Sequence, residues 1–193
     1  MKIFSPLYDK VMHYSKHQYA PFYLYGLAFV ESIFWPIPVD VMLAPMALAK
    51  RSLAWRFALG ATVFSVLGGA AGYYIGHTLY DPVVLPFIEF MGYQDKMDIA
   101  LAWFTEWGIM IIFIASFTPI PFKVFTITAG IMSMAFLPFL LTAFIGRGLR
   151  FFLVAAIMVI GGAKMEVKLR KYIDVLGWVT ILLAVLAYVV IKH

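Results

Sequence analysis

The chain has 193 residues, of which 64% are hydrophobic and 13% charged, whereas soluble domains are about 45–50% apolar and about 25% charged. This composition and a mean hydropathy of +0.92 exclude an ordinary soluble globular domain and predict an all-α integral membrane protein. The absence of cysteine from the sequence excludes disulfides, thiolate metal sites and cysteine nucleophiles. The net charge is +5, but no soluble basic segment is left over that could bind nucleic acid.

Residues 1–18 predict an amphipathic helix that lies on the membrane surface. Apolar side chains such as Phe4, Leu7 and Val11 recur at helical spacing, and lysines between them can face anionic headgroups. The charges interrupt this segment too often for a signal peptide or a span. A loose tail is the alternative.

Residues 19–49 predict a re-entrant hairpin rather than a straight span. The segment is apolar, but Pro36 and Pro38 remove two backbone donors and disfavour a helix at the residues before them. Broken backbone at membrane depth is tolerated only inside the protein or beside a water-filled cavity. Glu31 and Asp40 bracket this predicted break.

Residues 53–80 predict the first clean span. Gly68, Gly72 and Gly76 recur in it at four-residue spacing. Small residues at this spacing let helix backbones approach closely, so we interpret the three glycines as a helix-packing surface.

The segments after residue 98 repeat the order of a broken hairpin followed by a span. Residues 99–135 predict a second re-entrant hairpin, broken at Pro119 and Pro121, and residues 136–163 predict a second span. Residues 173–191 predict a C-terminal transmembrane helix.

An internal repeat relates the two halves. Pro36-Ile37-Pro38 reappears 83 residues later as Pro119-Ile120-Pro121, and a span follows each copy. A hairpin returns to its own side and the span 53–80 crosses once, so the second hairpin enters from the opposite face. The predicted architecture is therefore two inverted repeats, each a hairpin and a transmembrane helix.

The charge distribution predicts the orientation. Most lysines and arginines fall in segments assigned to one side, whereas the loop after the first span is acidic. By the positive-inside rule, the N-terminus is cytoplasmic and the C-terminus external.

Five ionisable residues fall within the predicted membrane segments. They are Glu31, Asp40, Lys123, Arg147 and Arg150. Each costs about 2.5–3.5 kcal/mol near mid-depth, so we expect them to form one cluster, two acids against three bases, where the hairpins meet. A purely structural ion-pair network is the alternative, and Lys123 could instead reach the outer surface.

Arg147 and Arg150 are three residues apart and share a helix face. Two guanidinium groups on one face repel each other unless an anion bridges them, and phosphate suits their planar donors. We therefore predict a phosphate site at this pair, assisted by Lys123, with Glu31 and Asp40 binding protons. The scattered histidines assemble no metal site and no catalytic or cofactor motif occurs, so no enzyme activity, metal or cofactor is expected.

Four segments carry a family resemblance. They are Glu31 to Asp40, Phe117-Thr118-Pro119-Ile120-Pro121-Phe122-Lys123, Ala129-Gly130-Ile131-Met132-Ser133-Met134 and Gly146-Arg147-Gly148-Leu149-Arg150-Phe151. As a set they resemble the DedA family, also described as the SNARE-associated Golgi protein or VTT-domain superfamily, and within it the short bacterial YqaA-type members. The resemblance implies a membrane domain over residues 19–163 with two facing re-entrant hairpins, in the bacterial cytoplasmic (inner) membrane.

The resemblance also implies a function. Family members move phospholipids or polyprenyl-phosphate carriers across the bilayer, often with the proton motive force, and bacterial members resemble transporters of undecaprenyl phosphate. Glu31 and Asp40 match acidic positions of the family's first hairpin. Lys123 stands where many members have arginine, and Arg147 and Arg150 stand where typical members have small or aromatic residues.

The leading hypothesis is a transporter of a phosphate-headed lipid, flippase-like or scramblase-like, with protons as the coupled ion. In this hypothesis Pro36, Pro38, Pro119 and Pro121 keep the hairpin tips unwound. The alternatives are a proton-coupled small-ion transporter with a closed aqueous path, and a non-transporting membrane scaffold. The sequence leaves the oligomeric state open, a homo-oligomer included.

Overall fold

The computed structural model describes residues 19–34, 38–79, 85–91, 94–118 and 122–162. The predicted surface helix 1–18, the predicted C-terminal helix 173–191 and the hairpin prolines Pro36, Pro119 and Pro121 lie outside these residues. Within the described ranges the chain forms helices and no strand, which confirms the expectation of an all-α fold.

The helices succeed one another with short connections. They are α2 (Ala20–Glu31), α3 (Asp40–Ala49), the 3-10 turn η1 (Arg51–Leu53), α4 (Ala54–Thr78), α5 (Leu85–Met91), α6 (Gln94–Trp107), α7 (Ile109–Phe117) and α8 (Phe122–Ile131). The helix Phe136–Gly162 follows α8. The two sequence-predicted spans, 53–80 and 136–163, coincide closely with α4 and with this last helix.

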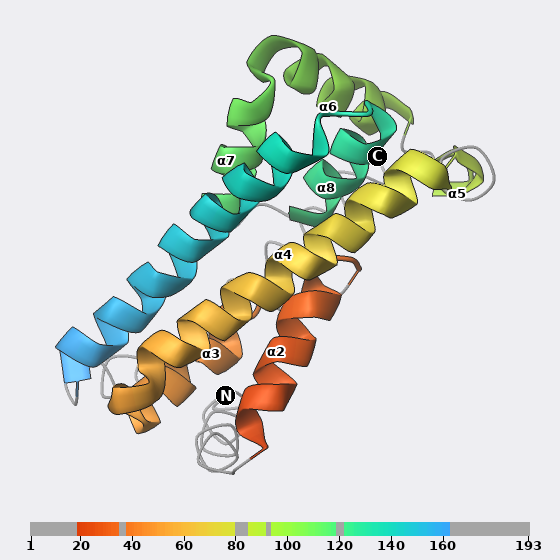
Figure 1. Cartoon of the computed structure of the whole chain (residues 1–193). Coiled ribbons are helices and arrows are strands. Elements are labelled where there is room, and N and C mark those ends of the chain that lie inside the picture. The colour runs from red at the N-terminus through yellow and green to blue at the C-terminus, as the bar shows by residue number, and fades with distance from the viewer. Residues whose placement is uncertain (1–18, 35–37, 80–84, 92–93, 119–121, 163–193) are drawn as a thin grey trace, which may run out of the picture.

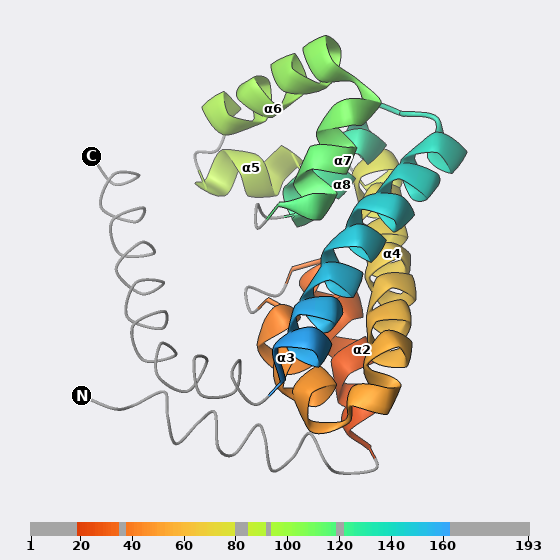
Figure 2. The ribbon, with the colours of Figure 1, turned by 90° about the vertical axis from the view of Figure 1, so that its left-hand side faces the viewer.

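The two long helices, α4 and Phe136–Gly162, run antiparallel and form the spine of the molecule (Figure 1). Helices α2 and α3 pack on one half of α4, and α8 packs on its other half. Helices α5 and α6 lie across the end of the bundle at which α4 finishes, as Figure 2 shows.

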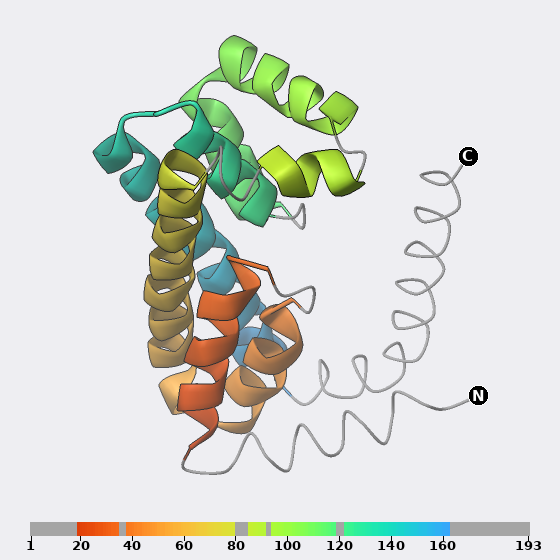
Figure 3. The same ribbon diagram turned by 90° about the vertical axis from the view of Figure 1, so that its right-hand side faces the viewer.

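Two pairs of shorter helices run from opposite ends toward the middle of the spine. Helix α2 rises from one end and α3 returns to that same end, as seen from the side in Figure 3. Helix α7 descends from the other end, and α8 returns to it (Figure 2). The end of α2 and the start of α3 therefore lie near mid-height, as do the end of α7 and the start of α8.

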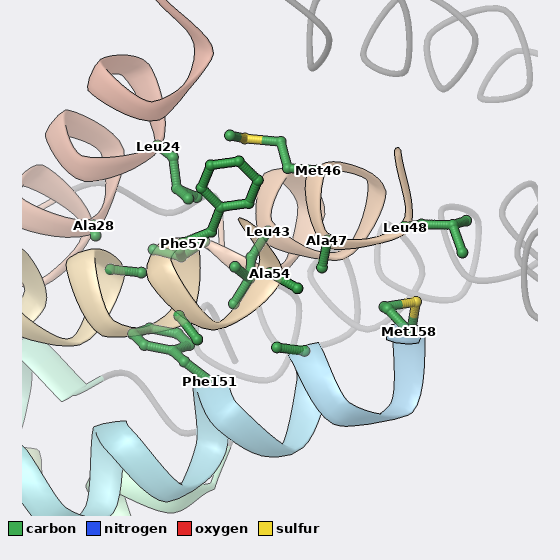
Figure 4. Packing of buried hydrophobic residues seen from close by; sticks show 14 of the residues in the cluster. Leu24, Ala28, Leu43, Met46, Ala47, Leu48, Ala54, Phe57, Phe151 and Met158 are labelled. Atoms are coloured by element: carbon green, nitrogen blue, oxygen red, sulfur yellow. The ribbon is translucent and has the colours of Figure 1, made fainter. Parts of the chain in front are cut away.

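The buried side chains form two separate hydrophobic cores. The first core joins α2, α3, the start of α4 and the end of the helix Phe136–Gly162 (Figure 4), and includes Leu24, Ala28, Leu43, Met46, Ala54, Phe57, Ala61, Phe151, Ala155 and Met158. The second core joins the end of α4 to α6, α7, α8 and the start of that helix, and includes Tyr73, Phe104, Ile112, Phe122, Phe125, Ala129, Phe139 and Ala143. Each core is thus built around one end of the bundle.

Glycines bring the backbone of α4 against its neighbours. A Cβ atom on Gly68 would collide with the carbonyl oxygen of Phe29 in α2, and one on Gly76 would collide with that of Ile127 in α8. Gly130 of α8 in turn faces the carbonyl oxygen of Tyr73. The absence of a side chain is therefore what permits α4 to approach both short-helix pairs so closely.

The outer face of the helix Phe136–Gly162 is apolar and exposed. Its exposed side chains recur every three or four residues, at Leu137, Leu141, Ile145, Leu149, Leu153, Ile157 and Ile160. This helix has 27 residues and is about 40 Å long, compared with about 30 Å for the hydrocarbon core of a bilayer. An apolar stripe of this length suits contact with lipid chains.

The second hairpin, predicted over residues 99–135, does not begin with a single helix at residue 99. Residue 99 lies inside α6, and a break at Gly108 separates α6 from α7. Gly108 adopts φ +53° and ψ −130°, a backbone region that is essentially restricted to glycine. This break lets α6 lie across the bundle end while α7 turns toward its middle (Figure 2).

Candidate functional site

Charged and hydroxyl side chains lie between the two hydrophobic cores. We call this set the charged layer, and it consists of Glu31, Ser32, Asp40, Ser65, Lys123, Arg147 and Arg150. On the helix Phe136–Gly162, Arg147 falls between Ala143 of the second core and Phe151 of the first. It lies about 16 Å along that helix, so the layer is close to mid-height.

Arg147 is enclosed on all sides and its side chain is only 2% exposed. Its Nη2 forms an ion pair with Glu31, the last residue of α2, and donates to Ser32 Oγ at 3.2 Å. Its Nε donates to Ser65 Oγ of α4 at 2.7 Å. One arginine thus joins the end of α2 to the middle of α4.

Two aromatic rings and a serine pair complete the surroundings of Arg147. The guanidinium carbon lies 4.6 Å from the ring centre of Phe122 and 5.2 Å from that of Phe151, which are cation–π distances. Ser32 Oγ and Ser65 Oγ are 2.8 Å apart, and Ser32 also donates to the carbonyl of Ala28. Both serines are fully buried.

Arg150 joins the two pairs of short helices. Its Nη2 forms an ion pair with Asp40, the first residue of α3, and its Nη1 donates to the carbonyl oxygen of Thr118. Thr118 caps the C-terminus of α7, where helix carbonyls lack their usual partners. Arg150 therefore satisfies a helix end in one pair while it neutralises a carboxylate in the other.

Lys123 also donates to a backbone carbonyl at the end of a helix, in this case from the second pair of short helices to the first. It belongs to the first turn of α8, and its Nζ donates at 2.9 Å to the carbonyl oxygen of Phe34, just beyond α2. The two cations, Lys123 and Arg150, thus bind backbone carbonyls beside the two breaks.

Asp40 differs from Glu31 in its surroundings. Among the described residues, Asp40 Oδ1 is buried without a hydrogen-bond partner, while Oδ2 binds Arg150. The Asp40 side chain is 27% exposed, compared with 16% for Glu31. A carboxylate with one unsatisfied buried oxygen is the less firmly held of the two.

The structure brings the sequence-predicted charges together as two ion pairs rather than as a single five-membered cluster. Glu31 pairs with Arg147 and Asp40 with Arg150, and Lys123 binds a carbonyl instead of an acid. The functional roles assigned to these residues from sequence stay predictions. The described residues contain no group of three potential metal ligands.

Sequence reasoning missed Ser32 and Ser65. Ser65 precedes Gly68 by three residues and so shares its face of α4, and Ser32 directly follows Glu31. These positions could have marked both hydroxyls as facing a neighbouring helix, but serine is common enough in membrane helices that the pattern alone does not single them out.

Comparison with known families decides the identity of this architecture. Residues 37–160 match the VTT domain. The chain belongs to the VTT-domain family, the DedA/SNARE-associated family of membrane proteins. The matched range begins after Glu31 and contains Asp40, Lys123, Arg147 and Arg150.

Relatives of this VTT-domain protein occur in bacteria and in an archaeon. An uncharacterized protein of Haemophilus influenzae is 47% identical over 193 residues, and one of Histophilus somni is 48% identical over 192 residues, in each case across the whole of both chains. An uncharacterized protein of Methanocaldococcus jannaschii is 28% identical over 133 residues, which cover 68% of this chain and 79% of that protein. No solved structure matches the chain significantly.

Proposed function

We propose that this VTT-domain protein moves a phosphate-headed lipid, undecaprenyl phosphate or a phospholipid, across the bacterial inner membrane. The observation that carries the proposal is the charged layer, in which Arg147, Arg150 and Lys123 lie between two apolar cores. Charges at membrane depth are costly and mark substrate pathways. The guanidinium N–H groups that now donate to the carboxylates of Glu31 and Asp40 can donate to a phosphate in the same way.

The proposed architecture is an inverted repeat of two re-entrant hairpins, α2–α3 and α7–α8. Helices α3 and α8 begin 82 residues apart, as do α4 and the helix Phe136–Gly162, which is close to the spacing of the Pro-Ile-Pro motifs. The opposite directions of the hairpins in Figures 2 and 3 support this proposal. Such repeats place the substrate site near the midplane and alternate access by rocking one half against the other.

Protons enter the proposed cycle through the carboxylates. An ionised Asp40 or Glu31 competes with phosphate for a guanidinium, and a protonated one does not. Among the described residues, Asp40 forms its ion pair with Arg150, and Arg147 lies three residues before Arg150 on the same helix. Protonation therefore releases an arginine for the headgroup, and deprotonation expels the headgroup again.

We predict the orientation from the charges at the two ends of the bundle. Lys50, Arg51 and Arg56 lie where α3 ends and α4 begins, whereas Asp98 and Glu106 lie on α6 at the far end. Because the chain has no native cysteine, a cysteine at exposed Ser52 should react with a membrane-impermeant maleimide only from the cytoplasmic side. A cysteine at Glu106 should react only from outside, and labelling of both from one side would contradict the proposed topology.

Transport itself is tested in proteoliposomes. We expect labelled polyprenyl phosphate to cross the bilayer faster with the protein than without it, and a pH gradient to change that rate. Asp40→Asn should abolish the gradient effect, because an amide cannot exchange a proton, whereas Glu106→Gln, an exposed acid on α6, should leave it intact. If well-folded protein moves neither polyprenyl phosphate nor phospholipid, the small-ion transporter and the scaffold become the better hypotheses.

A further inference from the structure

The two ion pairs of the charged layer differ in how firmly they are held. Arg147 is 2% exposed and has fixed contacts with Glu31, Ser32 and Ser65 from two helices. Rings lie close to it as well, since Phe122 and Phe151 are both within cation–π distance. A phosphate that bound Arg147 would have to displace most of these contacts at once.

Arg150 has fewer contacts and more exchangeable ones. Its side chain is 15% exposed, and its two bonds go to the Asp40 carboxylate and to the Thr118 carbonyl. Asp40 is itself partly exposed and keeps one oxygen without a partner among the described residues. An incoming phosphate could replace both acceptors while the aromatic and serine contacts of Arg147 stay intact.

We propose that Ser32 and Ser65 are positioning residues that hold Arg147 as a fixed charge, and that Arg150 is the guanidinium that exchanges Asp40 for the lipid phosphate. This inference rests on the proposed function and narrows its site. Ser32 follows the end of α2 and Ser65 lies in α4, so the serine pair anchors Arg147 to these two packed helices. Arg150, in contrast, binds Asp40 of α3 and Thr118 at the end of α7. A change of partner at Arg150 can therefore loosen one pair of short helices from the other.

The test separates ligand affinity from stability by measuring the melting temperature of the purified full chain. The probe is farnesyl phosphate, with farnesol as the control that lacks the phosphate. We expect farnesyl phosphate alone to raise the melting temperature of the wild type. Arg150→Lys should keep the melting temperature without ligand near the wild-type value and weaken the affinity for farnesyl phosphate about tenfold, because lysine loses the planar fork.

The serine variants should show the opposite behaviour. Ser65→Ala is expected to lower the melting temperature without ligand and to leave the farnesyl phosphate affinity within about twofold. Thr62→Val is the matched control, because Thr62 is equally buried one turn earlier on α4 and, among the described residues, its hydroxyl donates only to Ala58 of its own helix. Ser65→Thr, which keeps a hydroxyl, should recover part of the lost melting temperature.

A double-mutant cycle tests whether Ser65 acts through Arg147. In the Glu31→Gln/Arg147→Met background, Ser65→Ala should cause a clearly smaller loss, since only the contact between Ser65 and Ser32 is left to remove; an undiminished loss there would reject the positioning role. Loss of farnesyl phosphate affinity in Ser65→Ala with normal affinity in Arg150→Lys would overturn the assignment of Arg150. If farnesyl phosphate does not raise the melting temperature of the wild type and the wild type moves no lipid, the proposed function itself is wrong. A wild type that moves lipid while Arg150→Lys binds farnesyl phosphate normally would contradict only the assignment of Arg150.

Discussion

Replacing Arg147 with methionine is expected to lower the free energy of unfolding by about 3–5 kcal/mol. The substitution leaves the Glu31 carboxylate, which is only 16% exposed, without its cation. It also removes the donors that bind Ser32 and Ser65. Reversible unfolding in mixed detergent micelles, followed by tryptophan fluorescence, measures the change.

Two further variants identify the cause of that loss. Adding Glu31→Gln to Arg147→Met should recover most of the stability, because removal of both charges leaves no unpaired ion. Arg56→Met, which removes an exposed arginine from α4, should change the free energy of unfolding by about 0.5 kcal/mol or less. An Arg147→Met protein as stable as the wild type would mean that the contacts around Arg147 carry little energy.

The large loss of stability expected for Arg147→Met could not be predicted from the sequence. The sequence places Arg147 and Arg150 on one helix face, which the structure shows, and from that face alone both look like equivalent phosphate ligands. Which carboxylate meets which arginine depends on how α2 and α3 pack against the helix Phe136–Gly162, and helical periodicity holds no such information. Pairing with Glu31 and the serines makes Arg147 inaccessible, whereas pairing with Asp40 leaves Arg150 accessible.

The long helices were predictable because apolar length is a strong signal. Both coincide closely with their expected bounds, and the glycine spacing in α4 marks the face that approaches α2 and α8. The start of α7 was not predictable in the same way. Ile99 begins a mostly apolar segment, interrupted at Thr105 and Glu106, that continues past Gly108 without a proline. The turn at Gly108 is therefore set by packing of α6 across the bundle end and by the tolerance of glycine for positive φ.

Replacing Gly76 with alanine is the second substitution for which we expect a large effect. A Cβ atom there would collide with the backbone carbonyl of Ile127, and a backbone atom cannot move aside as a flexible side chain can. We expect a loss of about 3 kcal/mol in the free energy of unfolding, at the upper end of overpacking costs. Gly130→Ala, on the facing helix, should cost a similar amount because it meets the carbonyl of Tyr73.

Gly26 provides the matched control for Gly76. It is also a helical glycine, in α2, but a Cβ atom there meets nothing within 4 Å. Gly26→Ala should therefore stabilise the protein by about 0.5–1 kcal/mol, through helix propensity alone. Equal unfolding free energies for the two alanine variants would show that α4 and α8 can separate at little cost. The expected contrast would instead show that α4 and α8 pack as one rigid unit, so that a change of partner at Arg150 would have to move α3 relative to α7 while the contact between α4 and α8 stays intact.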